Sequence, residues 1–171
     1  MTGPAGLNAL IGSAETQLFA QTPAFRADQY GIRTVLQMGD QRIKFEIVLE
    51  GRVSLETPDL DDRVCGISTL TQLDLATSKL LANSDRWADD GAFSRDLIDL
   101  AMMKVTLRLL RQAVAKAEGA YGQSICRDLG KAIDRVQNRH GWLEYCMKAM
   151  SITLPKVVVW ERIRSLKRVL P

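Results

Sequence analysis

The segment Val35-Leu-Gln-Met-Gly-Asp-Gln-Arg-Ile-Lys-Phe-Glu-Ile-Val-Leu49 determines the first half of the fold. From residue 41 to residue 49, apolar and polar residues alternate with a period of two, which is the pattern of a half-buried β-strand. A second strand-like run precedes it, and the Gly39-Asp40 pair between them is typical of a hairpin turn. We therefore expect two antiparallel strands joined by a tight turn.

The residues that follow position 68 have a different pattern. Apolar residues recur there at intervals of three and four, which predicts helices. Ser94 is the expected N-cap of one helix, Gly119 is expected to end another, and Pro155 suits a first helical position. The expected helices span residues 70–84, 94–105, 106–118, 123–138, 142–150 and 155–170, and a further helix is expected over 7–18.

These elements predict an α+β fold: a small sheet, antiparallel or mixed, followed by a C-terminal helical bundle. Residues 1–66 would form the sheet region and residues 67–171 the helical region, together in one compact unit. The 171 residues suit a single domain. An exposed sheet edge would favour a homo-oligomer. No apolar run approaches the ~20 residues of a membrane span, and residues 1–10 contain no basic residue, so we do not expect a secretory signal. We expect a cytoplasmic protein without a membrane partner.

The net charge of +3 is distributed unevenly along the chain. Residues 1–103 contain 9 basic and 15 acidic residues, whereas residues 104–171 contain 14 basic and 5 acidic residues. The last expected helix is especially basic, with Arg162, Arg164, Lys167 and Arg168. This helix could bind a polyanion, face solvent, or be attracted to the acidic first part of the chain.

Cysteine and histidine are too few for several kinds of site. Cys65, Cys126 and Cys146 have no metal-binding spacing, and we expect three reduced thiols. His140 is the single histidine, which excludes a histidine-rich metal site. Its place near the end of an expected helix favours a role in stabilising the helix dipole.

Two sets of charged residues could carry chemistry early in the chain. Glu46 projects from the polar face of the second strand, where a carboxylate can bind Mg²⁺, although Lys44 on the same face makes an exposed salt-bridge ladder the alternative. Asp74 and Lys79 are five residues apart on a helix, so about 140° separates them and each must serve a different purpose. Lys79 could contact a phosphate, or the helix face could simply be solvated.

A third set is Arg95, Asp96 and Asp99, which share one edge of the next helix. These residues could form a surface salt bridge worth about 0–1 kcal/mol. They could instead orient Lys79 from the neighbouring helix. The segment 83–86 that ends the previous helix is expected only to cap the helix and pair at the surface.

In their order and spacing, five segments resemble the AbiEii/AbiGii nucleotidyltransferase toxin family. These are abortive-infection and type IV toxin–antitoxin proteins of bacteria with a DNA polymerase β-like fold. The main motifs are D-x4-K, matched by Asp74 and Lys79, and [RK]-D-x-x-D, matched by Arg95, Asp96 and Asp99. The matching segments are Phe25–Arg33, Ile43–Val48, Leu73–Ala82, Asp85-Arg86 and Arg95–Ala101.

The resemblance implies Mg²⁺-dependent transfer from a nucleoside triphosphate to an RNA or protein acceptor, and a cognate antitoxin as partner. By similarity, Glu46 would be a carboxylate of the metal site, and the D-x4-K motif would place Asp74 and Lys79 in the active site. Lys79 would contact the nucleotide phosphates. Arg95, Asp96 and Asp99 would position Lys79 or the base end of the active cleft.

One part of the family pattern is missing. Ile11-Gly-Ser13 provides the expected turn, but no D-x-D pair follows it, and the first acidic residue after Glu15 is Asp28. We therefore expect impaired catalysis, because lost charge clamps cost several kcal/mol of transition-state stabilisation. The chain would be a truncated gene product, a fragment, or a diverged member used for something else. The alternative function is a non-catalytic module that binds protein or nucleic acid.

Overall fold

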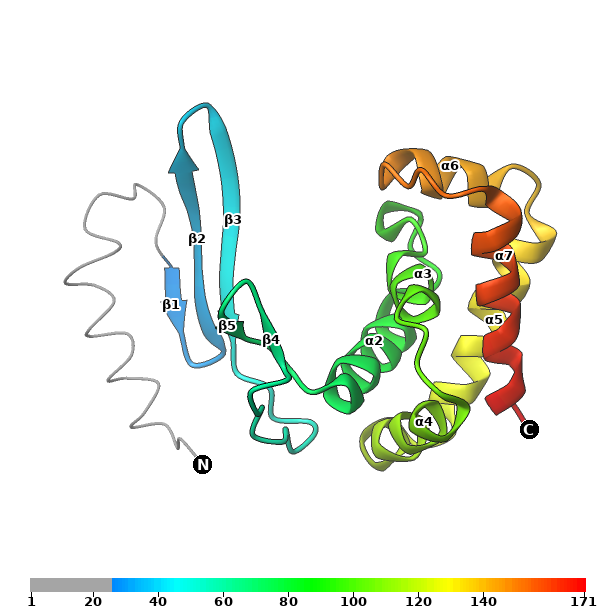
Figure 1. The fold of residues 1–171 in the computed structure, drawn as a ribbon, viewed down its shortest axis with the longest axis horizontal. Helices are drawn as coiled ribbons and strands as arrows, with labels where there is room; N and C mark the ends of the chain where they lie inside the picture. The colour runs from blue at the N-terminus through cyan, green and yellow to red at the C-terminus, as the bar shows by residue number, and fades with distance from the viewer. Residues whose placement is uncertain (1–25) are drawn as a thin grey trace. The chain divides into compact units, whose positions relative to one another are not determined.

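The computed structural model describes residues 26–171 and confirms the predicted α+β class (Figure 1). The helix expected over 7–18 and the Ile11-Gly-Ser13 turn lie outside the described residues. The chain divides into two compact parts, Met1–Gly51 and Arg52–Pro171, and each is treated by itself. The described residues of the first part form a sheet, and the second part is mostly helical.

The sheet of the first part contains strands β1 (Arg26–Asp28), β2 (Gly31–Met38) and β3 (Gln41–Val48), which lie side by side in the order β1-β2-β3 (Figure 1). Both strand pairs are antiparallel. Met38 lies opposite Gln41, so the predicted hairpin is confirmed with its two-residue turn, in which Gly39 has a φ of 58°.

The start of β2 requires a glycine at position 31. Its φ is 146°, and a Cβ atom there would collide with the carbonyl oxygen of Ile47 on the neighbouring strand. Glycine therefore allows the two backbones to approach each other closely at this point.

The second part opens with a short hairpin that the sequence did not predict. Strands β4 (Arg63–Val64) and β5 (Ile67–Ser68) pair in an antiparallel manner. The two turn residues between them, Cys65 and Gly66, have φ values of 52° and 79°. Two successive positive φ values are what a type I′ turn requires.

The six predicted helices beyond residue 68 are confirmed in the described part of the chain. Most boundaries lie within one to three residues of those expected. The helices are α2 (Gln72–Arg86), α3 (Arg95–Met102), α4 (Leu107–Tyr121), α5 (Ser124–Asn138), α6 (Trp142–Ala149) and α7 (Lys156–Ser165), with single turns of 3₁₀-helix at η1 (Asp90–Ala92) and η2 (Leu166–Val169).

Ser94 is the N-cap of α3 as expected, and its carbonyl accepts the Ile98 N–H at 3.0 Å, but its backbone is left-handed and its side chain makes no capping hydrogen bond. Two other expected details at helix ends were wrong. Gly119 lies within α4, which continues to Tyr121 and ends at Gly122 with a φ of 60°. Pro155 is the residue before α7 rather than its first residue. An exposed glycine costs a helix only about 1 kcal/mol, so packing of the residues around Gly119 can continue the helix.

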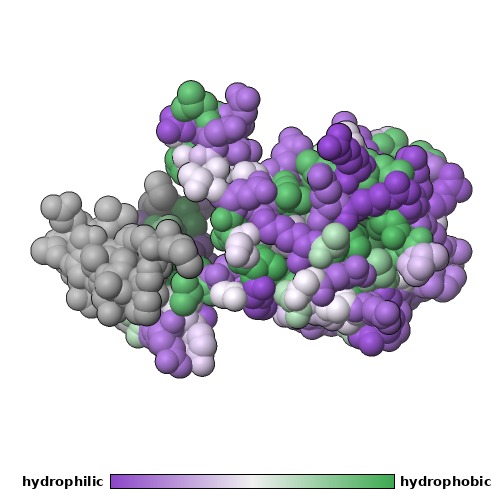
Figure 2. Space-filling view, turned by 90° about the horizontal axis from the view of Figure 1, so that it is seen from below, coloured by the Kyte–Doolittle hydropathy of each residue, from purple (hydrophilic) through white to green (hydrophobic). Residues whose placement is uncertain are grey.

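The core of the second part lies among the helices. Helix α2 packs against α3, α4 and α5, and α3 also packs against α7. Hydrophilic side chains are interspersed with scattered apolar ones on the face of this part that Figure 2 shows. Among residues 26–171, no helix combines the length and the apolar character that crossing a membrane would require. The fully buried residues of the helical core include Leu80, Leu81, Leu97, Ile98, Ile125, Leu129, Ile133, Val159 and Ile163.

Candidate functional site

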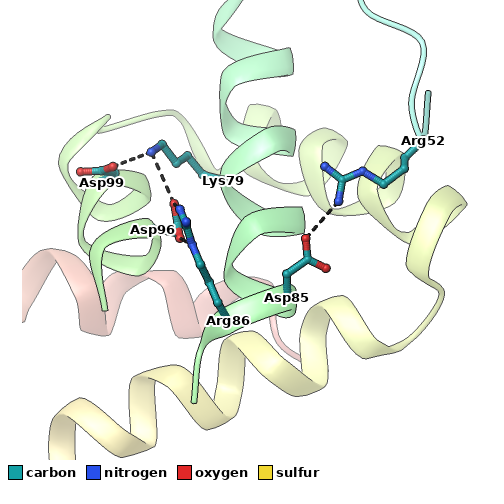
Figure 3. A network of polar contacts seen from close by, with 6 residues as sticks. All are labelled: Arg52, Lys79, Asp85, Arg86, Asp96 and Asp99. Atoms are coloured by element: carbon teal, nitrogen blue, oxygen red, sulfur yellow. Dashed lines mark hydrogen bonds and ion pairs between the residues drawn. The ribbon is translucent and has the colours of Figure 1, made fainter. Parts of the chain in front are cut away.

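Helices α2 and α3 bring three of the predicted site residues together. Lys79 projects from α2 toward α3, and its Nζ lies 2.5 Å from Oδ2 of Asp99 and 3.5 Å from Oδ1 of Asp96 (Figure 3). The two carboxylates are three residues apart on α3, so both face the same neighbour. They hold the ammonium group from two directions, and only 25% of the Lys79 side chain remains exposed.

Arg86 is a further member of this cluster. It lies seven residues after Lys79, which is two helical turns, and therefore on the same face of α2. Its Nε and Nη2 donate to Oδ2 and Oδ1 of Asp96 at 2.6 and 3.0 Å (Figure 3). These hydrogen bonds raise the pKa of Arg86, against a smaller lowering by desolvation. From its place at the end of the helix we expected only capping and surface pairing, although Asp85-Arg86 is one of the five segments that resemble the family. The spacing between Lys79 and Arg86 was the feature of the sequence that could have predicted its place in this cluster.

Asp96 is the buried centre of the cluster, with 4% of its side chain exposed. An isolated carboxylate so deeply buried would be unstable in its charged form. Here Lys79 and Arg86 both neutralise it, and the arginine does so with two parallel hydrogen bonds. We call Lys79, Arg86, Asp96 and Asp99 the α2–α3 cluster. It contains two cations and two anions.

The start of α3 is fixed by a contact from α6. Phe93 and Ser94 have φ values of 53° and 50°, so two successive non-glycine residues adopt the left-handed conformation. The indole Nε1 of Trp142 donates a buried hydrogen bond of 2.9 Å to Ser94 Oγ. Such backbone strain persists only when surrounding contacts over-determine it. Trp142 thereby helps to set the position of Asp96 two residues later.

Asp74 lies elsewhere, although it shares a motif with Lys79. Its side chain is fully buried, and its carboxylate accepts hydrogen bonds from Lys116 on α4 and, at 2.6 Å, from the backbone N–H of Glu56. Asp74 therefore ties α2 to α4 and to the preceding loop. Its predicted membership of the active site stays a prediction.

Arg52, in the segment that precedes α2, makes a further set of contacts with the helices. Arg52 donates to Asp85 at 3.0 Å and to the Tyr121 hydroxyl at 2.6 Å, and that hydroxyl donates to Asp85 at 2.7 Å. Figure 3 shows the Arg52–Asp85 pair apart from the α2–α3 cluster. The loop before α2 is thus anchored to the ends of both α2 and α4.

Arg95 is not brought into the α2–α3 cluster. It is exposed, and it makes no ion pair with any residue between 26 and 171. The surface salt bridge to Asp99 that the sequence allowed is not formed, because Asp99 bonds Lys79 instead. A role for Arg95 at the base end of a cleft is untested.

Glu46 belongs to the first part of the chain. Its carboxylate lies 3.4 Å from Nε of Arg33 and 3.0 Å from Nζ of Lys44, and Arg33 also contacts Asp28 at 3.2 Å. The exposed ladder of charges that was the alternative for Glu46 is therefore present. Metal binding by Glu46 stays a prediction.

The fit of the described residues to a magnesium ion is poor. Within residues 26–171, no group of three or more acidic, histidine or cysteine residues could hold a metal. A D-x-D sequence does occur at Asp59 and Asp61, in the loop before β4. The Asp59 carboxylate accepts the Asp61 backbone N–H at 2.8 Å, which is a local turn contact. The described part of the chain does not by itself supply a site for Mg²⁺.

Comparison with protein-family models matches residues 5–158 to the family described as nucleotidyl transferase AbiEii toxin, type IV TA system. The chain belongs to this family. The match covers most of the chain and confirms the resemblance drawn from the sequence. Comparison with curated proteins and with solved structures gave no match.

In this AbiEii family member, the structure unites part of each of the two sequence motifs. Lys79 of the D-x4-K motif meets both aspartates of the [RK]-D-x-x-D motif. Asp74 and Arg95, the remaining motif residues, face other surroundings. The chemistry available at the α2–α3 cluster is that of preorganised N–H donors, which suits an anionic ligand.

Proposed function

We propose that this toxin-family protein binds a nucleoside triphosphate, with Lys79 and Arg86 contacting the phosphates. The observation that carries the proposal is the geometry of Lys79 Nζ, which both aspartates of α3 hold in place. A lysine that is fixed before binding loses less side-chain entropy when it meets a phosphate. Family membership supports the nucleotide as the ligand.

The hydrogen-bond inventory of the cluster leaves donors for a ligand. An ammonium group has three N–H donors and a guanidinium five. Lys79 uses two of its donors on the aspartates, which leaves one N–H without a partner among residues 26–171. Arg86 uses two of its donors on Asp96, which leaves three without a partner among the same residues. Arg86 is 48% exposed, so its remaining donors can reach a bound molecule.

The cluster as a whole is electrically neutral, so long-range attraction cannot supply the affinity. Directed hydrogen bonds from Lys79 and Arg86 must do so instead. Asp96 and Asp99 would act as positioning residues, because they hold the donors and do not themselves meet the phosphates. This division explains why two carboxylates are compatible with an anion site.

Nucleotidyl transfer by this protein is proposed to be weak. No D-x-D pair comes directly after Gly12-Ser13, and the described residues do not assemble a magnesium site. Glu46 stays the residue that family resemblance assigns to the metal. A cognate antitoxin is the proposed protein partner, since the family is a type IV toxin–antitoxin system.

The test compares Lys79→Met with Lys148→Met, a change at an exposed lysine of α6 that removes the same charge. Binding of ATP, GTP, CTP and UTP is measured by calorimetry and by the shift in melting temperature, with and without Mg²⁺. Loss of one charge-assisted hydrogen bond of ~1.5–3 kcal/mol should weaken binding about 10- to 150-fold in the Lys79 variant. The Lys148 variant should bind like the wild type.

Two results would overturn the proposal. One is a wild-type protein that shows no binding of any of the four nucleotides. The other is a folded Lys79→Met variant, verified by circular dichroism, that binds as tightly as the wild type. Robust transfer of labelled nucleotide to RNA or protein would contradict the part of the proposal that concerns weak catalysis.

A further inference from the structure

The structure separates the cations of the C-terminal helix into two groups. Arg164 pairs with Glu161 at 2.6 Å, and Lys167 lies 3.2 Å from Asp134 of α5. By contrast, Arg162 and Arg168 have no carboxylate partner in the described part of the chain. The four residues that looked equivalent in sequence are therefore not equivalent in the folded protein.

Three more cations without carboxylate partners come from the α3–α4 connection and from α4. Lys104, Arg108 and Arg111 are all exposed, and none forms an ion pair within residues 26–171. Arg108 and Arg111 are three residues apart on α4, so they lie side by side on that helix. Lys104 lies in the connection that leads into α4, with a left-handed φ of 53°.

Several contacts place all five cations on one side of the second part. Lys104 and Arg168 line the same small hollow, together with Leu107. Leu107 is one helical turn before Arg111, so Arg111 lies on the same side of α4. Arg162 donates from Nη1 to the Sδ atom of Met102, two residues before Lys104, at 3.1 Å. We call Lys104, Arg108, Arg111, Arg162 and Arg168 the cationic face.

The composition of the cationic face points to phosphates rather than to a membrane. No large exposed apolar side chain occurs in residues 100–112 or 162–169, whereas a membrane-surface helix needs such side chains to insert. Four of its five cations are arginines, whose planar fork matches phosphate oxygens. These two segments also contain no aromatic residue for stacking on unpaired bases.

We propose that the cationic face binds the phosphodiester backbone of a double-helical nucleic acid without regard to base sequence. This binding would not depend on the nucleotide site at Lys79, since the two sets of residues do not overlap. Up to five phosphates would be neutralised. At about 0.9 counterions released per phosphate, affinity would fall up to roughly 500-fold between 50 and 200 mM salt.

The experiment measures binding of the full chain to 20-base-pair RNA and DNA duplexes of mixed sequence by fluorescence anisotropy between 50 and 200 mM salt. Arg108→Gln/Arg111→Gln is compared with Arg164→Gln/Lys167→Gln, which removes the same charge from residues that have carboxylate partners. Glutamine is a good helix former, so both variants should keep their helices. Melting curves and ATP-induced melting shifts are recorded for both.

The first variant should bind the duplexes at least about 10-fold more weakly at 50 mM salt, with a salt slope smaller by about 2. The second should bind like the wild type, and both should keep the response to ATP. The proposal is overturned if the wild type binds neither duplex at 50 mM salt, or if the two variants weaken equally. Equal competition by polyglutamate would instead assign the face to an acidic protein, and equal binding to anionic lipid vesicles would assign it to a membrane.

Discussion

Replacing Asp96 by Asn should reveal how much the α2–α3 cluster contributes to stability. Asparagine has nearly the same shape but carries no charge, and its NH₂ group would face a donor of Arg86 or Lys79. In the wild type, Asp96 accepts two hydrogen bonds from Arg86 and one from Lys79 while being 4% exposed. Asp99→Asn is the matched control, because it changes the same chemistry one turn away at a site that is 33% exposed.

The magnitudes differ because the burial differs. Breaking a fully buried ion pair costs ~3–5 kcal/mol, but Arg86 is half exposed and can be partly solvated, so we expect about 2–3 kcal/mol for Asp96→Asn. Asp99 makes one contact, to Lys79, near the surface, and we expect about 0.5–1 kcal/mol. For a unit of this size, 1 kcal/mol shifts the melting temperature by ~4 °C. The expected drops are about 8–12 °C and about 2–4 °C.

Thermal and urea unfolding of both variants, followed by circular dichroism, provide the measurement. The Asp96→Asn/Arg86→Gln double variant should lose less stability than the sum of its single variants, because each change removes the same pair of hydrogen bonds. Equal destabilisation by the two asparagine variants, or strict additivity in the double variant, would show that Asp96 is not the buried centre of the cluster.

Three further predictions concern other parts of the protein. Hydrogen bonds from Arg127 hold the pKa of the buried Asp128 below its ordinary value. The ionised carboxylate therefore stabilises the fold above about pH 4, and this contribution is lost as the pH falls further. The difference in melting temperature between wild type and Asp128→Asn should shrink below pH 4. Cys146 is buried, which raises its pKa, whereas Cys65 is exposed. Iodoacetamide should therefore label Cys65 first in the folded protein and reach Cys146 only on unfolding, as measured by peptide mass spectrometry. Labelling in the reverse order would contradict the structure. Ser94→Ala should lower the free energy of unfolding in urea by about 1–2 kcal/mol, because the buried indole N–H of Trp142 loses its acceptor. Ser94→Gly loses the same acceptor but should lower it less, because glycine relieves the left-handed φ of 50°. A larger loss of stability for glycine than for alanine would contradict this reasoning.

Local sequence patterns predicted most of the secondary structure in residues 26–171, but not the β4–β5 hairpin. A period of two and the Gly39-Asp40 turn predicted the hairpin of β2 and β3. Intervals of three and four predicted the helices beyond residue 68. The helix ends were predicted less well: Gly119 did not end α4, because Ala117 before it is buried and Ala120 and Tyr121 after it pack against the core.

The order of short motifs also allowed the family to be recognised from the residues alone. It suggested that Lys79 could be oriented by Asp96 and Asp99, which share one edge of a helix, and the structure brings these three together. The motifs could not show that Asp74 would bond Lys116 instead of joining them. A motif records which residues occur at a spacing, but not which neighbour each will meet.

Only the tertiary structure determined which charges are paired. Within residues 26–171, it joined Arg86 to Asp96 and Lys167 to Asp134 across helices, whereas Arg162 has no carboxylate partner there. The physical reason is that a helix period fixes the direction of each side chain about its own axis. The partner depends on which helices pack together and at what rotation, and that is set by the burial of the whole apolar core. The sequence by itself therefore determined most of the elements and the family of this protein, while the packing of α2, α3, α4, α5 and α7 decided which cations of residues 26–171 pair with carboxylates of other helices and which remain for a ligand.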